Sequence, residues 1–363
     1  MMSRLANNQS VVWAIVLIAV LIALPAVVPR YWVYFAGILG INIIAVHGLN
    51  IMTGYTGLLS LGHAAFVGVG AYTVALSQSK LGLPFYLAIP FAGIVAALMG
   101  VAFGLPSLRI RGLYLVIATL AAQFLLNFVF VHWQSVTNGD AGLTVQPATI
   151  FGYPLNNETR AYYLILFCDV ALTLFAINVI RSRVGRAFIA VRERDRTAEV
   201  LGVRIVWYKF VAFALGSFYA GVAGALLAYF NQFVNPEQFG LVLSVFFLSA
   251  VIVGGMGSTL GAVLGAVFMT LLPEFLRGGG LAIGGALGFD IASILVPLRE
   301  TVFGFLIIGF LILEPRGLAQ LWKRAQQKFL TPRIAADSSA VGRTRVGTEQ
   351  PKRSQGSHNG ETS

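Results

Sequence analysis

Hydrophobic runs of membrane-spanning length follow one another along most of this chain, with polar segments between them. About 20 apolar residues in a helix cross the hydrocarbon core of a bilayer. Ten runs reach or approach that length, and a transmembrane helix is predicted over each of Val11–Val28, Trp32–Asn50, Leu58–Ser77, Pro84–Leu105, Leu113–Val131, Ala161–Ile180, Trp207–Phe230, Leu241–Gly254, Ser258–Leu276 and Val302–Leu313. The pattern predicts an all-α integral membrane protein with about ten transmembrane helices.

Residues 181–206 interrupt this pattern with an arginine-rich polar segment. Small and apolar residues among the arginines predict a short helix over Gly185–Arg194. Asp195 then offers an N-cap oxygen to a second helix, and Gly202 stands where a C′ glycine would end it. A loop that only joined two spans would not need capped helices. We therefore expect a partner to dock here on the cytoplasmic side.

The distribution of basic residues predicts the side of the membrane on which each loop lies. Cytoplasmic loops carry an excess of Lys and Arg. With both termini in the cytoplasm, 20 of the 25 Lys and Arg residues fall on that side. The predicted domains are therefore a cytoplasmic N-terminus (residues 1–10), a transmembrane domain with a periplasmic loop (11–321 and, within it, 132–160) and a basic, disordered cytoplasmic tail (322–363). The first run lacks an A-x-A-like cleavage site, so we expect it to remain as an anchor.

One further apolar segment, residues 281–298, does not fit this topology as a span. Crossing the membrane would place Asp290 at mid-depth and would put the basic tail outside. We therefore predict a re-entrant or interfacial segment on the outer face.

Composition narrows the class of protein. With 57% hydrophobic residues, 11% charged residues and a mean hydropathy of +0.81, the chain does not resemble a soluble globule. The net charge of +11 lies in loops and tail rather than in a soluble basic domain, so a nucleic-acid partner is not expected. Cys168 is the sole cysteine, which excludes an intramolecular disulfide and a cysteine-based metal site.

Motifs for catalysis are missing as well. The chain has no GxxxxGK[ST] phosphate loop and no HExxH metal motif, and Gly254–Thr259 lacks the lysine of the former. Asp169 has no second clear intramembrane acid with which to act. We expect no catalysis, no cofactor and no metal in this chain.

Two glycine clusters precede predicted helices. Gly54–Gly57 leads into Leu58–His63, and Gly254–Gly257 leads into Ser258–Gly261. Broken helices in transporters often mark the permeation path, because their free N–H groups can bind a carboxylate. Candidate path residues are those at the clusters and the polar residues inside spans: Asn50, Gly54, Gly57, Gly62, His63, Asp169, Gly254, Gly255 and Gly257. The alternative for each is a structural role, as close helix packing for the glycines and as hydrogen bonding between helices for the polar residues.

Several spaced motifs together resemble one known family. They are Gly48–Phe66 followed by Gly70–Tyr72, then Leu108–Leu115, Val253–Ser258 and Pro315–Leu318. In this order they resemble the LivM-type permease subunit of branched-chain amino-acid ABC importers, over Trp32–Leu321. The segment Gly278–Pro297, which is longer and richer in glycine than expected for the family, and the extended basic tail depart from it.

The resemblance implies a role for the polar segment and a set of partners. In that family, the loop between the sixth and seventh spans is the coupling segment that sits in a cleft of the ATPase subunit. The positions that correspond here are Gly185, Arg186, Ala187, Glu193, Asp195, Ala198, Glu199, Leu201 and Gly202. The implied partners are a homologous second permease subunit, two ATP-binding subunits, a soluble substrate-binding protein on the outer face, and membrane lipid.

The resemblance leaves the solute open among close relatives. Branched-chain amino acids are the first expectation, and urea or a short amide is the second, with aromatic acids also carried in the superfamily. From other classes, an ion-coupled secondary carrier and an intramembrane enzyme remain as alternatives. An ion-coupled carrier usually needs several ionisable groups at mid-membrane, and Asp169 is a single candidate for that role.

Overall fold

A computed structural model of the chain describes residues 19–107, 112–150, 153–154, 157–287 and 317–330, together with five isolated positions between 301 and 309. Contacts divide the chain into one unit over Met1–Ala319 and a second over Gln320–Ser363. The first unit holds the helical bundle. In the second unit, the described residues belong to the C-terminal part of α14 (Gly317–Leu330).

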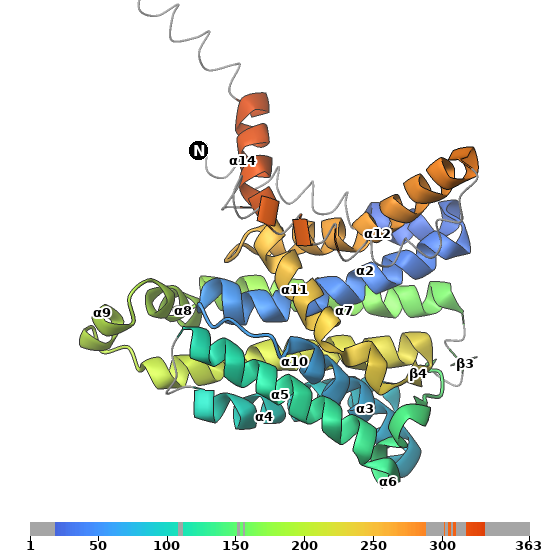
Figure 1. Ribbon diagram of the computed structural model, residues 1–363, viewed down its shortest axis with the longest axis horizontal. Helices are drawn as coiled ribbons and strands as arrows, with labels where there is room; N and C mark the ends of the chain where they lie inside the picture. Colours follow the sequence, from blue (N-terminus) through green and yellow to red (C-terminus); the bar gives the residue numbers. More distant parts are fainter. Residues whose placement is uncertain are drawn as a thin grey trace, which may run out of the picture. The chain divides into compact units, whose positions relative to one another are not determined.

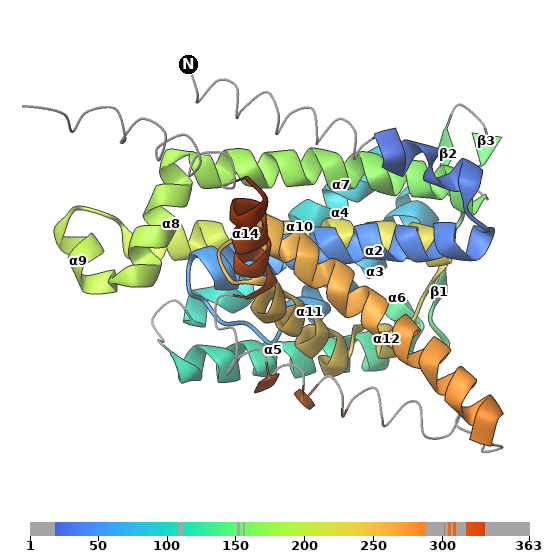
Figure 2. The ribbon, with the colours of Figure 1, turned by 90° about the horizontal axis from the view of Figure 1, so that it is seen from above.

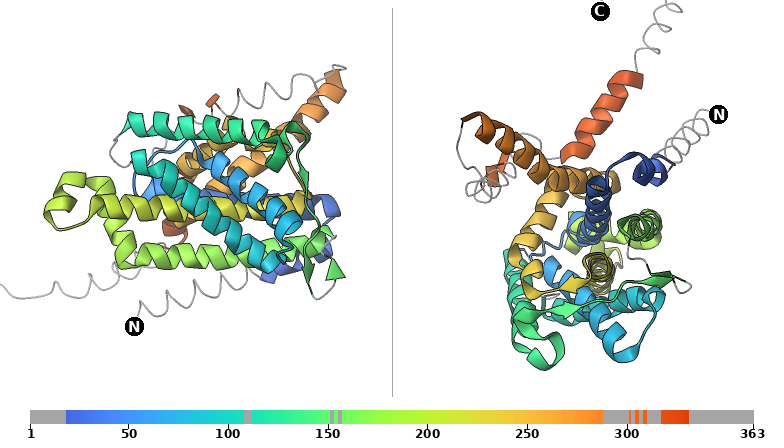
Figure 3. Two further views of the ribbon diagram at one scale, coloured as in Figure 1. Left: turned by 90° about the horizontal axis from the view of Figure 1, so that it is seen from below. Right: turned by 90° about the vertical axis from the view of Figure 1, so that its right-hand side faces the viewer.

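A central helix organises the bundle of the first unit. Helix α10 (Ile205–Asn231) packs against α2 (Arg30–Leu49), α3 (His63–Leu81) and α4 (Phe85–Ser107). An end-on view shows α10 surrounded by these helices (Figure 3, right). The runs form helices because a helix satisfies its backbone N–H and C=O groups internally, which lipid requires.

The remaining helices flank this centre (Figures 1 and 2). They are α5 (Leu113–His132), α6 (Gln134–Thr137), α7 (Glu158–Arg181), α8 (Arg183–Glu193), α9 (Asp195–Val200), α11 (Leu241–Gly254) and α12 (Thr259–Leu287), with a π-helix η1 (Asn50–Tyr55) and two 3-10 turns, η2 (Gly139–Ala141) and η3 (Pro236–Phe239). Helix α7 packs mainly along α2, and α11 packs against α12.

Among the described residues, four two-residue strands lie in the connections between helices. Strand β1 (Leu143–Thr144) pairs antiparallel with β4 (Phe233–Val234), with Leu143 opposite Val234. Strands β2 (Thr149–Ile150) and β3 (Tyr153–Pro154) form a second antiparallel pair. The first pair ties the predicted periplasmic loop to the segment that follows α10.

Seven helices among the described residues are long and apolar enough to cross a membrane. They cover Arg30–Tyr55, Phe85–Gly104, Tyr114–His132, Glu158–Arg181, Ile205–Asn231, Pro236–Gly254 and Thr259–Leu276. The chain is thus an all-α, multi-pass membrane protein, as predicted. The run predicted over Leu58–Ser77 appears as the buried helix α3, which begins only at His63 because residues 58–62 are not helical. Of the first run, residues 19–28 are described, with 19–27 in a helix, and most of Val302–Leu313 lies outside the described residues.

Two predicted boundaries are wrong. Helix α12 runs without interruption from Thr259 to Leu287, so residues 281–287 belong to it and not to a separate re-entrant segment. The rest of that segment lies outside the described residues. In addition, the helix predicted to end at Asn50 continues through Tyr55 as a π-helix. Both helices extend because each further helical residue satisfies its backbone groups without water.

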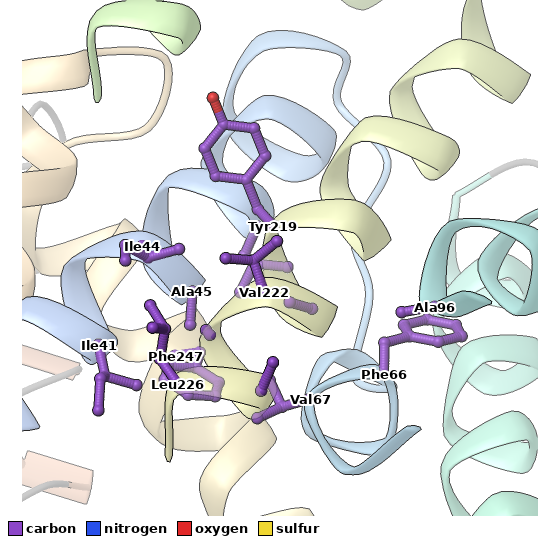
Figure 4. Packing of buried hydrophobic residues seen from close by; sticks show 14 of the residues in the cluster. Ile41, Ile44, Ala45, Phe66, Val67, Ala96, Tyr219, Val222, Leu226 and Phe247 are labelled. Carbon is purple, nitrogen blue, oxygen red and sulfur yellow. The ribbon is translucent and has the colours of Figure 1, made fainter. Parts of the chain in front are cut away.

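The core of the first unit gathers around α10 (Figure 4). Tyr219, Val222 and Leu226 of α10 meet Ile44 of α2 and Phe247 of α11. The Tyr219 ring is fully buried, and its hydroxyl donates a 2.7 Å hydrogen bond to the Leu172 carbonyl of α7. A buried phenol would otherwise lose its hydrogen bonds with water.

Small residues let α10 approach α3 at backbone distance. At Gly224, an added Cβ would lie 2.8 Å from the carbonyl carbon of Val67 and 3.0 Å from the amide nitrogen of Ala71. Both neighbours are backbone, which cannot rotate away. Close approach of this kind drives helix association in lipid, where hydrophobicity does not.

Replacing Gly224 with Val should therefore destabilise the protein by about 3 kcal/mol, at the upper end of overpacking costs. The melting midpoint of the detergent-purified protein measures this. Ala171→Val on the exposed face of α7 is the matched control. Equal midpoints for the two variants would contradict the close packing of α10 on α3.

Candidate functional site

The polar segment 181–206 forms α8 and α9, which project beyond the bundle at the end where α7 finishes and α10 starts (Figures 1 and 2). Helix α8 was predicted over Gly185–Arg194 but spans Arg183–Glu193. It begins earlier because Ser182 is the N-cap, and its side chain accepts a 3.1 Å hydrogen bond from the Val184 amide.

One face of α8 is buried against the ends of α7 and α10. Phe188 is fully buried and meets the Tyr208 ring edge to face. At Gly185, an added Cβ would lie 2.5 Å from the Ile180 Cα, so no larger side chain fits against the last turn of α7. Ala187 is also buried. These small residues determine how closely α8 sits against the bundle.

Helix α9 is held by a charge pair and ended by a glycine. The prediction that Asp195 is the N-cap is wrong, because Arg194 occupies that position and Asp195 is the first helical residue. The Asp195 carboxylate instead accepts a 3.1 Å hydrogen bond from Lys209, whose side chain is 6% exposed. A buried ammonium requires a partner of opposite charge, which explains why the Asp195 side chain pairs with Lys209 and does not cap the helix. The predicted end is confirmed: Gly202 has φ +83° and follows the last turn.

The nine residues predicted to couple to an ATPase divide into two groups. Gly185, Ala187 and Ala198 are buried and Asp195 is half-buried, so these shape the segment. The exposed members are Arg186, Glu193, Glu199, Leu201 and Gly202. Leu201 is 77% exposed, and its neighbour Val200 is 88% exposed. The sequence prediction missed Val200, although an apolar pair in a polar segment is a recognisable signal of a contact surface.

The two glycine breaks, which lie far apart in the sequence, meet in space. The Asn50 side chain of η1 accepts a 3.0 Å hydrogen bond from the Gly257 amide and donates one of 3.0 Å to the Ser258 carbonyl. The hydroxyls of Tyr55 and Thr259 lie 3.1 Å apart and are hydrogen-bonded. The end of η1 thus docks on the connection between α11 and α12.

Glycines fill this junction because no side chain has room there. An added Cβ at Gly54 would lie 2.6 Å from the Gly257 amide nitrogen, and one at Gly254 would lie 3.0 Å from the Gly265 Cα. Gly317, at the start of α14, packs against the same connection, with its added Cβ 2.6 Å from the Gly255 Cα. Three of the motifs that carry the family resemblance therefore converge on one place.

One residue at this junction was missed by sequence reasoning. Arg192 of α8 donates a hydrogen bond from Nη1 to the Gly54 carbonyl of η1. In the sequence, it is one of several arginines in a basic loop that is predicted to be cytoplasmic, and it carries no separate signal. It joins α8 to the glycine breaks.

The start of α3 forms a second polar cluster. Gly62 is the N-cap, and the Ala64 and Ala65 amides donate 2.9 Å hydrogen bonds to Ser244 and to Gln123 respectively. His63 is fully buried, with Nε2 2.8 Å from the Ala45 carbonyl oxygen. Two of the first N–H groups of α3 are thus bonded to protein side chains in this structure.

The candidate path residues therefore fall into three places. Asn50, Gly54, Gly57, Gly254, Gly255 and Gly257 surround the junction of the two breaks, and Gly62 and His63 start α3. Asp169 lies on α7, which contributes to none of these hydrogen bonds, and is half-buried with one carboxylate oxygen lacking a partner.

Comparison of the sequence with known proteins identifies the family. A sequence profile for "Branched-chain amino acid transport system / permease component" matches residues 31–313. The chain belongs to this permease family. It is 33% identical to the high-affinity branched-chain amino acid transport system permease protein LivM of Salmonella typhimurium over 83% of this chain and 73% of the relative.

Other relatives carry the same description. LivM of Escherichia coli is 33% identical over 84% of this chain and 73% of its own length. The permease LivH of Salmonella typhimurium is 25% identical over 75% of this chain and 88% of its own length. The chain is thus a LivM-type permease by family. No solved structure matches it.

Replacing Lys209 with Met should loosen α9, because the half-buried Asp195 carboxylate then loses its ion pair with the Lys209 ammonium. A loss of about 1–2 kcal/mol would increase the opening of α9 roughly fivefold to thirtyfold. Hydrogen exchange of the amides of residues 198–203 measures it. Arg204→Met, at an exposed position beside α10, is the control and should leave exchange unchanged. Equal protection in both variants would contradict the role of the pair.

Proposed function

We propose that this chain is a permease subunit of an ATP-driven ABC importer that carries branched-chain amino acids into the cell. The observation that carries the proposal is membership of the permease family, with LivM relatives whose names specify high-affinity branched-chain amino acid transport. The solute is transferred from those names. ATP hydrolysis is assigned to separate subunits, because the sequence has no phosphate loop.

The α8–α9 pair is the proposed coupling segment. Its exposed residues Arg186, Glu193, Glu199 and Leu201, together with Val200, would contact the ATPase subunit. Gly185, Ala187 and Ala198 would hold the segment's shape, the Asp195–Lys209 pair would anchor α9, and Gly202 would end it. The exposed apolar pair at the tip supports this role, since apolar side chains in water favour burial by a partner.

We propose ten transmembrane helices with both termini in the cytoplasm, on the strength of the 20 basic residues that this topology places inside. The coupling segment is then cytoplasmic, and the β1–β4 pair and residues 132–160 face the periplasm. Residues 1–10 and 322–363 are the proposed cytoplasmic ends of the transmembrane domain over 11–321. The proposed location is the cell inner membrane.

The proposed assembly contains a second, homologous permease subunit, two ATP-binding subunits, an external substrate-binding protein and surrounding lipid. The match to LivH supports a second permease, because LivM and LivH relatives both align with this chain. Closure of the ATPases would move the coupling segments and switch the pore between outward and inward access. The solute path is proposed near the junction of the two breaks, the start of α3 and Asp169.

Uptake of radiolabelled leucine and urea tests the proposal in cells with and without this gene. Loss of the gene should abolish leucine uptake, vanadate should block it, and an uncoupler should have the smaller effect. If only urea uptake falls, the assignment as an ABC importer holds and the solute is urea or a short amide. Inhibition mainly by an uncoupler would instead indicate an ion-coupled carrier.

Replacing Gly185 with Val or Glu193 with Gln should lower leucine uptake about tenfold, the range of an ordinary coupling energy. Gly185→Val would displace α8, and Glu193→Gln would remove an exposed charge from the ATPase contact. Both variants should insert into the membrane as well as the wild type does. Glu158→Gln, at the exposed start of α7, is the matched control. Unchanged transport in both variants would contradict the coupling assignment.

A further inference from the structure

Four successive carbonyls of the π-helix η1, those of residues 51–54, each accept a hydrogen bond from a specific donor. The Ile51 carbonyl accepts a 3.0 Å hydrogen bond from the Thr56 hydroxyl, and the Met52 carbonyl accepts one of 3.0 Å from the Leu58 amide. The Thr53 carbonyl accepts one of 3.1 Å from the Gly57 amide. These three donors belong to the same turn. The next carbonyl, at Gly54, accepts its hydrogen bond from Arg192 of the coupling segment.

Glycines make the space in which the Arg192 side chain lies. Gly57 and Gly257 have φ angles of +76° and +80°, which disfavour any other residue. An added Cβ at Gly57 would lie 3.2 Å from the Arg192 Cγ, and one at Gly257 would lie 2.6 Å from Arg192 Nη1. Each of the two breaks therefore contributes one wall of the site that receives the arginine.

A continuous set of contacts runs from this arginine to both breaks. Arg192 binds Gly54 at the end of η1, and Asn50 at the start of η1 binds Gly257 and Ser258 of the α11–α12 connection. Since η1 continues α2 without interruption, the same contacts reach the centre of the bundle. The Arg192–Gly54 hydrogen bond is thus a direct link between α8 and η1.

We propose that Arg192 is a positioning residue that transmits movement of the coupling segment to the two helix breaks. The inference rests on the proposed function, since it assumes that α8 moves with an ATPase. With the hydrogen bond formed, α8 holds η1 against the α11–α12 connection. When α8 shifts, the guanidinium either pulls η1 along or releases the Gly54 carbonyl, and in both cases the junction of the breaks changes.

The chemistry of arginine suits this task. The guanidinium keeps its charge under all cellular conditions and donates in fixed directions from a planar group. A cation is also favourable beside the last carbonyls of a helix, where the backbone dipoles concentrate negative charge. Lysine keeps the charge but presents it on a shorter, less directional group, so Arg192→Lys should preserve part of the connection.

The test uses the whole complex, with its ATPases and binding protein, in proteoliposomes, and measures leucine uptake and ATP hydrolysis together. Arg192→Ala should lower the leucine transported per ATP hydrolysed about tenfold, which corresponds to loss of one ordinary hydrogen bond. For Arg192→Lys, the leucine transported per ATP hydrolysed should lie between the values for Arg192→Ala and the wild type. Arg183→Ala, an exposed arginine on the same helix, is the matched control and should keep the wild-type ratio.

Three outcomes separate the possibilities. An unchanged ratio in Arg192→Ala overturns the inference. A fall in uptake and hydrolysis in proportion to a lower yield of assembled complex also overturns it, because Arg192 would then serve only folding or docking. If the wild-type complex shows no ATP-dependent leucine uptake, the proposed function itself fails, independently of any variant.

Discussion

In a lipid bilayer, each backbone N–H and C=O group must find its partner inside the protein, and the rest of this structure follows from that constraint. Continuous helices meet it automatically. Where η1 and α11 end and where α3 begins, side chains supply the missing partners. They are Asn50, Arg192, Gln123 and Ser244. A buried polar group left without a partner costs about 1–3 kcal/mol, so these positions accept few substitutions.

The same constraint explains why glycine clusters and polar side chains occur together. A side chain can bond to a backbone group of a neighbouring helix only if the two backbones approach closely. Gly54, Gly254 and Gly257 permit that approach at the junction of the breaks, and Gly62 permits it at the start of α3. The glycines and the polar residues are therefore parts of one arrangement, rather than alternatives between packing and function.

Local patterns predicted those features that depend on local physics. The lengths of the hydrophobic runs predicted the helical bundle. The arginine-rich segment and its terminal Gly202 predicted α8 and α9. Local patterns could not predict contacts between residues that lie far apart in the sequence. The pairing of Asp195 with Lys209 depends on how α9 folds back on α10, and the meeting of Asn50 with Gly257 joins positions 207 residues apart. Arg192 could not be distinguished, because any basic residue in a cytoplasmic loop satisfies the charge pattern.

A junction built from a few hydrogen bonds is also suited to change. Tightly packed cores respond to force by switching between discrete arrangements, whereas a hydrogen bond to a charged group can break and reform at about 1.5–3 kcal/mol. The buried face of α8 is closely packed on the bundle, because Phe188 is fully buried and Gly185 leaves no room for a larger side chain against the end of α7. Displacement of the exposed tip is therefore expected to reach the C-terminal end of α8, which adjoins α9. There Arg192 donates its hydrogen bond to the Gly54 carbonyl, near the end of η1.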